Sequence, residues 1–505
     1  MDFLRDLPVL ILGLGESGLA MARWCSRFGA HVTVWDSRLP APNAARLEAE
    51  VPNATLLGGE LHAGHLSGMR LLLKSPGLSP SDARIAPLLQ EARATGIAAI
   101  GELELFARAL AELKETQAYA PQVLAITGTN GKTTTAAMTA LLVERAGRRV
   151  ALAGNIGPTM LDTLAAALDG DEAQCPEVWV LELSSFQLAG VRDFEPSAAA
   201  LLNLSQDHLD WHGTMADYAA AKARIFGREA LLVINRDDPQ VEALVPAPTP
   251  AKGRVKVSPR SVLRFGLDAP RRAGDFGLVV ENGMAWLVRA LPIDDSFKAR
   301  KGDEAAEIHL QRLMPADALR LRGRHNAANA LAALALATAI GCPLAPMLHG
   351  LREYAGEPHR LQPVGRVGEV EAYDDSKGTN VGATVAALNG LGADKAPARL
   401  IVILGGDGKG QDFKPLAAPL ARHARAVATI GRDAAAVEAV IEGLPIQRHA
   451  TLEAAVAWCF EQAQSGDAVL LSPACASLDM FKNYAHRAEV FVQAVQSLAH
   501  DRGTV

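Results

Sequence analysis

Short apolar runs rich in β-branched residues alternate with longer Ala- and Leu-rich stretches along most of the chain. In the middle of the chain, the runs that are apolar at nearly every position lie at 122–127, 148–155, 177–183, 198–205 and 229–235. Strands of this kind are buried on both faces, as they are in a parallel sheet covered by helices. The alternation therefore predicts doubly wound α/β layers.

Composition and charge exclude several classes of protein. Hydrophobic residues make up 49% and charged residues 21% of the 505 residues, which is an ordinary globular composition. The net charge of -6 gives no electrostatic reason to expect a nucleic acid or an anionic membrane as a partner. The five cysteines are scattered and never in C-x-x-C spacing, which argues against a disulfide framework or a zinc site and fits a reducing cytosol. The longest apolar tract, at 329–340, is shorter than the roughly 20 residues of a membrane crossing, so we expect a cytoplasmic protein.

A first glycine loop, GLGESG, contains Gly13, Gly15 and Gly18 and lies between an expected strand and an expected helix. Asp36 ends the next expected strand, roughly 20 residues further on, where the dinucleotide fingerprint has the acid that binds a ribose. Taken alone, this pattern favours an NAD-dependent oxidoreductase. Its specificity is weak, because a glycine-lined helix N-terminus accepts any anion.

A second glycine loop, GTNGKTT at 128–134, joins an expected buried strand to a helical stretch. The standard nucleotide loop, G-x-x-x-x-G-K-S/T, would need a glycine at Ile126, so this loop is shorter. Lys132 can nonetheless reach terminal phosphates, backbone N–H groups from Gly128 to Thr133 can line phosphate oxygens, and the Thr133 hydroxyl can bind Mg²⁺. A generic strand-to-helix turn does not account for this combination, so we interpret it as a nucleotide-phosphate site.

Polar side chains end the apolar runs of the middle segment, at Thr127, Asn155, Glu182 and Asn203. The carboxyl ends of parallel strands face the ligand crevice of such a sheet. An isolated carboxylate at Glu182 would be costly unless it were solvated or bound to a cation, and Mg²⁺ prefers such oxygen ligands. The next loop holds two acids and two histidines without the pattern of a zinc site: Asp207, His208, Asp210 and His212. By default these are loop caps, and one histidine is a candidate outer Mg²⁺ ligand.

Lys222 and two asparagines of a later helix each admit two interpretations. A lysine in a helical stretch is by default exposed to solvent, and nothing in the spacing around Lys222 contradicts this. Asn326 and Asn329 lie three residues apart on one helix face, where they either cap the helix or bind a nucleotide base.

From about residue 357 a further α/β segment carries polar loops after its expected strands. The loops are YDDSKGTN at 373–380, GGDGKGQDF at 405–413 and SPACASLDMF at 472–481. Lys377 and Lys409 on these loops predict a site for a small, negatively charged molecule. Cys475 has no nearby histidine or asparagine partner, so we interpret it as a packed thiol.

Together these motifs resemble the Mur ligase family, the ATP-dependent amide-forming enzymes of peptidoglycan synthesis. The family's shortened loop is G-T-N-G-K-S/T, which GTNGKTT matches, and five motifs occur in the family's order over essentially the whole chain. DDSKGTN, GGDGKGQDF and SPACASLDMFKNY are similar to the motifs of the member that adds D-glutamate to UDP-N-acetylmuramoyl-L-alanine. Two positions depart from the usual pattern: Gly378 replaces Ala and Tyr484 replaces Phe.

Three α/β domains are expected. They are a Rossmann-like UDP-sugar-binding domain at 1–115, a central ATPase domain with a P-loop-type parallel sheet at 116–356, and a Rossmann-like amino-acid-binding domain at 357–505. Between 245 and 320, where the alternation loosens, we expect a small antiparallel appendage and an exposed loop at 294–307.

The resemblance also implies the residues of the site. ATP would bind at Gly128, Thr129, Asn130, Gly131, Lys132, Thr133, Thr134, Asn326, Asn329, Arg360 and Asp375. The UDP-sugar would bind at Gly15, Ser17, Asp36, Ser37, Arg38, Ser75, Gly77 and Asn155, and D-glutamate at Lys377, Thr379, Lys409, Ser477 and Tyr484. Two Mg²⁺ ions would be held by Thr133, Glu182, His208 and, after carbamylation, Lys222. The expected catalytic residues are Lys132, Glu182, His208, Lys222 and Lys377.

The reaction implied by the resemblance has two steps. The carboxylate of the sugar-linked L-alanine attacks the γ-phosphate of ATP, and the amine of D-glutamate then attacks the acyl phosphate. A monomer without nucleic-acid or membrane partners is expected. Three alternatives stay open: another Mur-type or folylpolyglutamate-type amide ligase, an NAD-dependent oxidoreductase, and a non-catalytic nucleotide-binding scaffold.

Overall fold

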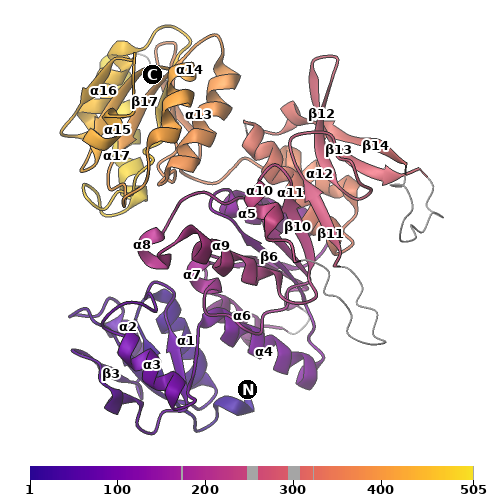
Figure 1. The fold of residues 1–505 in the computed structure, drawn as a ribbon, viewed down its shortest axis with the longest axis vertical. Helices are drawn as coiled ribbons and strands as arrows, with labels where there is room; N and C mark the ends of the chain where they lie inside the picture. Colours follow the sequence, from indigo (N-terminus) through magenta and orange to yellow (C-terminus); the bar gives the residue numbers. More distant parts are fainter. Residues whose placement is uncertain (172–173, 247–259, 294–306, 322, 504–505) are drawn as a thin grey trace.

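A computed structural model of the chain describes residues 1–171, 174–246, 260–293, 307–321 and 323–503. The exposed loop expected at 294–307 therefore lies, apart from its last residue, outside the described residues. Three large sheets follow one another along the chain, each flanked by helices, and the N-terminal, central and C-terminal parts lie in sequence order in space (Figure 1). The predicted α/β class with parallel sheets is confirmed.

The first sheet has the strand order β3-β2-β1-β4-β5, with every neighbouring pair parallel. Its strands are β1 (Pro8–Leu12), β2 (His31–Trp35), β3 (Thr55–Leu57), β4 (Leu71–Lys74) and β5 (Ala98–Ile100), and its helices are α1 (Glu16–Arg27), α2 (Ala44–Glu50), α3 (Ala86–Ala94) and α4 (Glu102–Gln117). The first turn of α1 passes so close to the preceding loop that a Cβ on Gly18 would lie 1.9 Å from the Gly13 carbonyl oxygen. This close approach explains why position 18, the last glycine of the first loop, cannot carry a side chain.

The central sheet is parallel, with the strand order β11-β10-β9-β6-β8-β7. Its strands are β6 (Gln122–Thr127), β7 (Val150–Gly154), β8 (Val178–Glu182), β9 (Ala198–Leu201), β10 (Leu231–Asn235) and β11 (Val262–Phe265). The helices of this part are α5 (Lys132–Arg145), α6 (Met160–Asp169), α7 (Ser185–Leu188), α8 (Leu209–His212), α9 (Met215–Ala223), α10 (Pro239–Ala243), α11 (Arg324–Ala339) and α12 (Leu344–Glu353). The side chains of β8 are buried along its whole length, as the apolar run predicts for a strand covered on both faces.

The predicted antiparallel appendage is confirmed. It consists of β12 (Phe276–Glu281), β13 (Met284–Pro292) and β14 (Ile308–Pro315), paired in that order. Its inner residues Phe276, Leu287 and Met314 join the same hydrophobic core as α11 and α5. The appendage therefore packs on the central sheet's helical layer and stands away from the C-terminal part (Figure 1).

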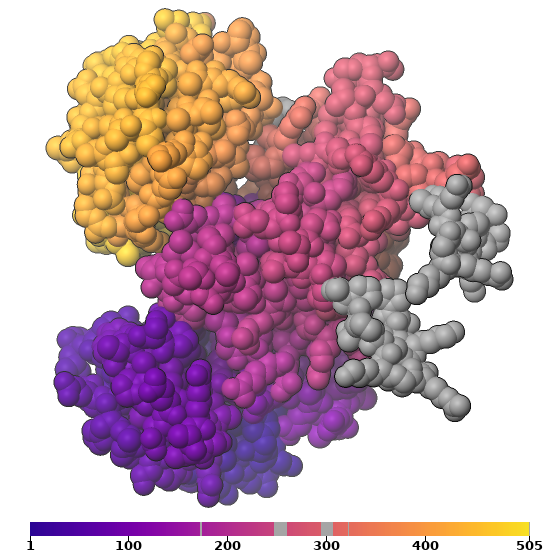
Figure 2. Space-filling model, in the orientation of Figure 1, coloured from indigo at the N-terminus to yellow at the C-terminus, as the bar shows by residue number. Residues whose placement is uncertain are grey.

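The third large sheet has the order β15-β16-β20-β17-β18-β19. Of the strands that the structure describes in this sheet, β15 alone runs antiparallel to its neighbour. The strands are β15 (Gln362–Val367), β16 (Val370–Asp374), β17 (Leu400–Gly405), β18 (Ala424–Ile430), β19 (Ile446–Arg448) and β20 (Ala468–Leu471). The helices are α13 (Val381–Lys395), α14 (Ala417–His423), α15 (Ala434–Glu438), α16 (Leu452–Gln462) and α17 (Tyr484–Asp501). Figure 2 shows the surface indented between this part, in orange and yellow, and the central part. Within the described ranges, none of the helices has both the length and the hydropathy needed to cross a bilayer.

Candidate active site

The second glycine loop lies between the end of β6 and the start of α5, as predicted. Gly131 has φ +81°, and a Cβ there would lie 2.5 Å from Asn329 Oδ1, so the loop is packed directly against α11. The Nζ of Lys132 donates to the carbonyl oxygens of Gly128, at 3.0 Å, and Thr129, at 2.8 Å. The lysine is thus folded over the loop whose N–H groups are expected to line phosphate oxygens.

The charged groups around Lys132 come from separate parts of the chain. Burial lowers the pKa of Lys132, the carboxylates of Glu182 and Asp207 raise it, and Arg360 lowers it further. The pKa of Lys377 depends on the same groups: Arg360 and Lys132 lower it, and Glu182 raises it. Burial is the largest cause for Lys377 and brings its pKa to about 8. The loop after β6, the end of β8 and the loop after β16 therefore share one electrostatic environment.

Glu182 carries an unpartnered buried oxygen. Its side chain is 2% exposed, and Oε1 accepts a hydrogen bond of 2.9 Å from Nδ2 of Asn155. Oε2 is buried and has no hydrogen-bond partner in the described structure. A buried carboxylate oxygen without a donor is costly, and a cation would satisfy it. Glu182 therefore fits the metal-ligand role implied for it.

No three His, Cys, Asp or Glu side chains gather into a metal-sized group anywhere in the described ranges. Mg²⁺ is usually held by one or two carboxylates together with waters and substrate phosphates, and Glu182 offers one such carboxylate. The Thr133 hydroxyl accepts a hydrogen bond of 2.5 Å from Nη2 of Arg360. The hydroxyl expected at the metal thus lies at the junction between the central and C-terminal parts.

Lys222 on α9 is 1% exposed, so its interpretation as a solvated surface lysine is wrong. Its Nζ donates to the Gly128 carbonyl at 2.7 Å and to Thr127 Oγ1 at 3.3 Å, and it lies 4.7 Å from the centre of the Tyr218 ring. Burial, followed by the charge of Lys132, lowers the pKa of Lys222 well below that of an exposed lysine. The buried amine is therefore easier to deprotonate than that of an exposed lysine.

The two histidines of the loop after β9 are placed differently. His208 has φ +53°, its Nε2 lies 3.5 Å from Asp207 Oδ2, and its ring meets that of Phe186 edge to face. Burial lowers the pKa of His208, and Lys409 and Lys132 lower it as well. His212 instead pairs its Nε2 with Ser185 Oγ at 2.9 Å. The pKa of His208 thus responds to Lys132 and Lys409, whereas burial, His208 and Lys222 lower that of His212 to about 4.

A pocket at the junction of the central and C-terminal parts gathers most of the residues predicted to bind ATP. Its lining includes Asn130, Gly131, Thr134, Asn326, Asn329, Arg360, Asp375 and Lys377. Asn329 Nδ2 donates to Asn326 Oδ1 at 3.2 Å, so the two amides form one pair facing the pocket rather than two separate caps. His325 also lines this pocket, and no sequence motif identified it.

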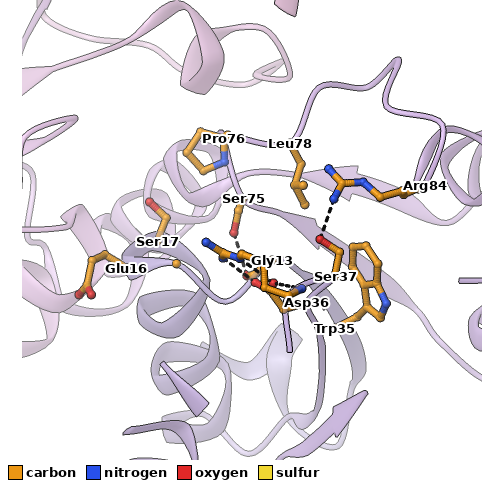
Figure 3. A pocket seen from close by; sticks show the side chains of 13 residues that line it. Gly13, Glu16, Ser17, Trp35, Asp36, Ser37, Ser75, Pro76, Leu78 and Arg84 are labelled. Carbon is orange, nitrogen blue, oxygen red and sulfur yellow. Dashed lines mark hydrogen bonds and ion pairs between the residues drawn. The ribbon is translucent and has the colours of Figure 1, made fainter. Parts of the chain in front are cut away.

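The first glycine loop borders a separate cavity of about 480 Å³ in the N-terminal part (Figure 3). Seven of the eight residues predicted for the UDP-sugar line it: Gly15, Ser17, Asp36, Ser37, Arg38, Ser75 and Gly77. The eighth, Asn155, lies instead beside Glu182 at the central sheet. Arg84, which sequence patterns did not identify, lines the cavity and donates to Ser37 Oγ at 2.8 Å (Figure 3).

Asp36 is a fixed negative charge in this cavity. Burial alone would raise its pKa, but hydrogen bonds from the Arg38 guanidinium and from the backbone N–H groups of Leu14 and Arg38 outweigh burial and lower the pKa to about 2. Asp36 thus stays ionised and holds Arg38 in place.

Four of the five residues predicted for D-glutamate lie on loops after β16, β17 and β20, which are neighbours in the third sheet, and the fifth, Tyr484, is the first residue of α17. The Nζ of Lys377 lies 3.7 Å from the centre of the Tyr484 ring, and Ser477 is buried on the β20 loop. Lys409 is exposed and has φ +50°, with its backbone N–H donating to Asp407 Oδ1 at 3.0 Å. Thr379 lies two residues after Lys377 on the β16 loop. The packed-thiol interpretation of Cys475 is confirmed, because burial raises its pKa to about 12.

Arg487 supports these loops and was not identified from sequence. Its side chain is 0% exposed, and its guanidinium donates to the Ser376 carbonyl at 2.8 Å, to Ser376 Oγ at 3.0 Å and to the Cys475 carbonyl at 3.1 Å. It thereby ties the loop after β16 to the loop after β20. An arginine in an amphipathic helix is by default expected on the surface, so no local pattern signalled this position.

Three family models match the chain. They are the Mur ligase MurD-like N-terminal domain at residues 8–101, the Mur ligase middle domain at 126–337, and the Mur ligase glutamate ligase domain at 359–475. A relative from Albidiferax ferrireducens named UDP-N-acetylmuramoylalanine--D-glutamate ligase is 59% identical over 100% of this chain and 98% of its own. A relative of the same name from Burkholderia mallei is 56% identical over 99% of both chains.

Solved structures share the fold. The MurF ligase of Thermotoga maritima, solved in complex with ADP, superposes with a TM-score of 0.58 at 17% identity, covering 99% of this chain and 96% of that one. The UDP-N-acetylmuramate-alanine ligase of the same organism gives a TM-score of 0.54 at 18% identity, over 97% and 99%.

Proposed function

Because the chain belongs to the Mur ligase family, we propose that it is an ATP-dependent ligase that adds D-glutamate to UDP-N-acetylmuramoyl-L-alanine during synthesis of peptidoglycan precursors. The observation that carries the proposal is the meeting of the phosphate loop, Glu182 and Lys377 in one electrostatic environment, in a chain that matches D-glutamate ligases over its full length. The oxidoreductase alternative has no comparable support, because these motifs and relatives belong to amide ligases.

The reaction proceeds through an acyl phosphate. The carboxylate of the sugar-linked L-alanine attacks the γ-phosphorus of ATP, and ADP leaves. The amine of D-glutamate then attacks the acyl carbon, the new amide bond forms, and inorganic phosphate leaves. Lys132 and Lys377 place positive charge where the phosphoryl group is transferred, which stabilises the charge that develops in both steps.

Two Mg²⁺ ions, held by Thr133, Glu182, His208 and carbamylated Lys222, would neutralise phosphate charge when bound. The lowered pKa of the buried Lys222 amine supports the carbamylation, because the neutral amine is the form that attacks CO₂. The unpartnered Oε2 of Glu182 supports the metal assignment.

Each of the three substrates is assigned to a different part of the chain. The UDP-sugar binds the cavity of the first sheet, with Asn155 near its reactive end, and ATP binds the junction pocket. D-glutamate binds at Lys377, Thr379, Lys409, Ser477 and Tyr484. The corresponding domains are 1–115, 116–356 and 357–505, and the enzyme acts as a cytoplasmic monomer.

A phosphate-release assay tests the proposal. Release from ATP should require both UDP-N-acetylmuramoyl-L-alanine and D-glutamate, and L-glutamate should not replace D-glutamate. Lys132→Ala should lower kcat at least about 1,000-fold, because it removes a charge that acts on the transferring phosphoryl group. Release that does not depend on D-glutamate, or retained activity of Lys132→Ala, would contradict the assignment.

A further inference from the structure

Asn380 joins the C-terminal part to the phosphate loop and is not among the residues assigned above. It is 5% exposed and lies at the N-cap of α13, directly after the loop that carries Lys377 and Thr379. Its Oδ1 accepts a hydrogen bond of 2.9 Å from the backbone N–H of Ala383, which caps the helix. The side chain therefore has a local role in its own domain.

The other end of the same amide reaches across to the central part. Nδ2 of Asn380 donates to Asn130 Oδ1 at 3.0 Å and to Asp207 Oδ2 at 3.3 Å. Asn130 belongs to the phosphate loop, and Asp207 precedes His208. One buried amide thus connects the loop that holds ATP phosphates, the loop that holds His208 and the helix that follows the amino-acid loop.

A second contact shows how closely α13 approaches the phosphate loop and the loop after β9. A Cβ on Gly382 would lie 2.7 Å from Ser205 Oγ and 3.0 Å from Asn130 Nδ2. The first turn of α13 therefore rests directly on the phosphate loop and on the loop after β9. A side chain at position 382 would push the two surfaces apart.

We propose that Asn380 is a positioning residue that latches the amino-acid loop onto the phosphate loop, so that the D-glutamate amine and the acyl phosphate meet only when this contact is made. The inference rests on the proposed function. Buried polar contacts of this kind fix one arrangement of two surfaces, because an imperfect arrangement leaves Nδ2 of Asn380 without its acceptors. Loss of the latch should impair D-glutamate transfer more than binding of the UDP-sugar, which is held in the first sheet.

Two substitutions separate the role of Asn380 as a latch from its role as a helix cap. Asn380→Ser and Asn380→Asp both retain an oxygen that caps a helix N-terminus, but neither can donate to Asn130 and Asp207 as the amide does. Asn380→Asp also places a second carboxylate next to Asp207. Thr451→Ala is the matched control, because it removes the N-cap of α16 in the same part of the chain, at a distance from the junction.

Steady-state kinetics, melting temperature and small-angle scattering provide the readouts. Asn380→Ser should keep the wild-type melting temperature, and both Asn380 variants should lower kcat at least tenfold and raise the KM for D-glutamate, with the KM for UDP-N-acetylmuramoyl-L-alanine unchanged. Asn380→Asp should be the more impaired. Thr451→Ala should melt earlier and keep wild-type kinetics. A non-hydrolysable ATP analogue should reduce the radius of gyration of the wild-type protein more than that of Asn380→Ser.

Two results would overturn the latch: kinetic constants of both Asn380 variants within twofold of wild type, or losses in Asn380→Ser accompanied by a lower melting temperature like that of Thr451→Ala. If the wild-type protein forms no amide, the proposed function fails by itself. The scattering comparison with the ATP analogue then still tests the latch, because it does not depend on turnover.

Discussion

At the scale of single residues, burial determines the protonation of the charged groups in the site. It lowers the pKa of Lys222 well below the usual range and that of Lys377 to about 8, and it raises the pKa of Asp375 to about 7. The site therefore contains groups that change charge near neutral pH, which ordinary lysine and aspartate side chains do not.

Asp375 gives a pH-dependent stability that can be measured. Burial raises its pKa above that of the unfolded chain, so its contribution to stability is complete below pH 3.8 and is lost as the pH rises through about 7. Asp375→Asn cannot ionise, although it keeps a partner for the Ser472 hydroxyl that donates to Asp375 at 2.7 Å. Relative to wild type, the variant should gain at least about 1 kcal/mol of stability between pH 5 and pH 8 in urea melts without ligands. If the difference in stability between Asp375→Asn and wild type did not change with pH, the assignment of Asp375 as a buried carboxyl group that ionises near pH 7 would be wrong.

At the scale of elements, α17 fixes the geometry of two substrate loops through Arg487. Replacing Arg487 with Met should lower the free energy of unfolding by about 2–4 kcal/mol, because two backbone carbonyls and a hydroxyl lose a buried charged donor. Arg487→Lys should recover only part of this, since one ammonium cannot reproduce the fork of three bonds. Urea denaturation checks both variants. A Met variant as stable as wild type would show that the loops are held in another way.

The strands were predictable because their burial is encoded locally. Runs such as 177–183 are short and apolar at nearly every position, which is typical of a strand covered on both faces. The phosphate loop was also predictable from local sequence, because its glycines and its lysine lie within one short stretch. Lys222 and Arg487 were not, because their burial depends on partners that are 94 and 111 residues away in sequence. Asn155 illustrates a third case: its position at a strand end was predicted, but its hydrogen bond to Glu182 was not.

At the scale of the whole molecule, the three sheets each contribute one part of the proposed site. The cavity beside the first glycine loop lies in the first part, the phosphate loop in the second, and Lys377, Lys409 and Ser477 in the third. The contacts of Arg360 with Thr133 and of Asn380 with Asn130 connect the last two. Under the proposed function, the acyl phosphate is made beside the phosphate loop and consumed by an amine held on the third sheet, so these contacts would bring the two steps together.

Oxygen transfer from the substrate carboxylate to phosphate tests this account most directly. UDP-N-acetylmuramoyl-L-alanine labelled with ¹⁸O in both carboxylate oxygens should be incubated with ATP and D-glutamate, and the released phosphate analysed by mass spectrometry. An acyl phosphate that is attacked at carbon leaves its bridging oxygen with phosphorus, so each phosphate released should carry one ¹⁸O. Amide product accompanied by unlabelled phosphate would contradict the central claim.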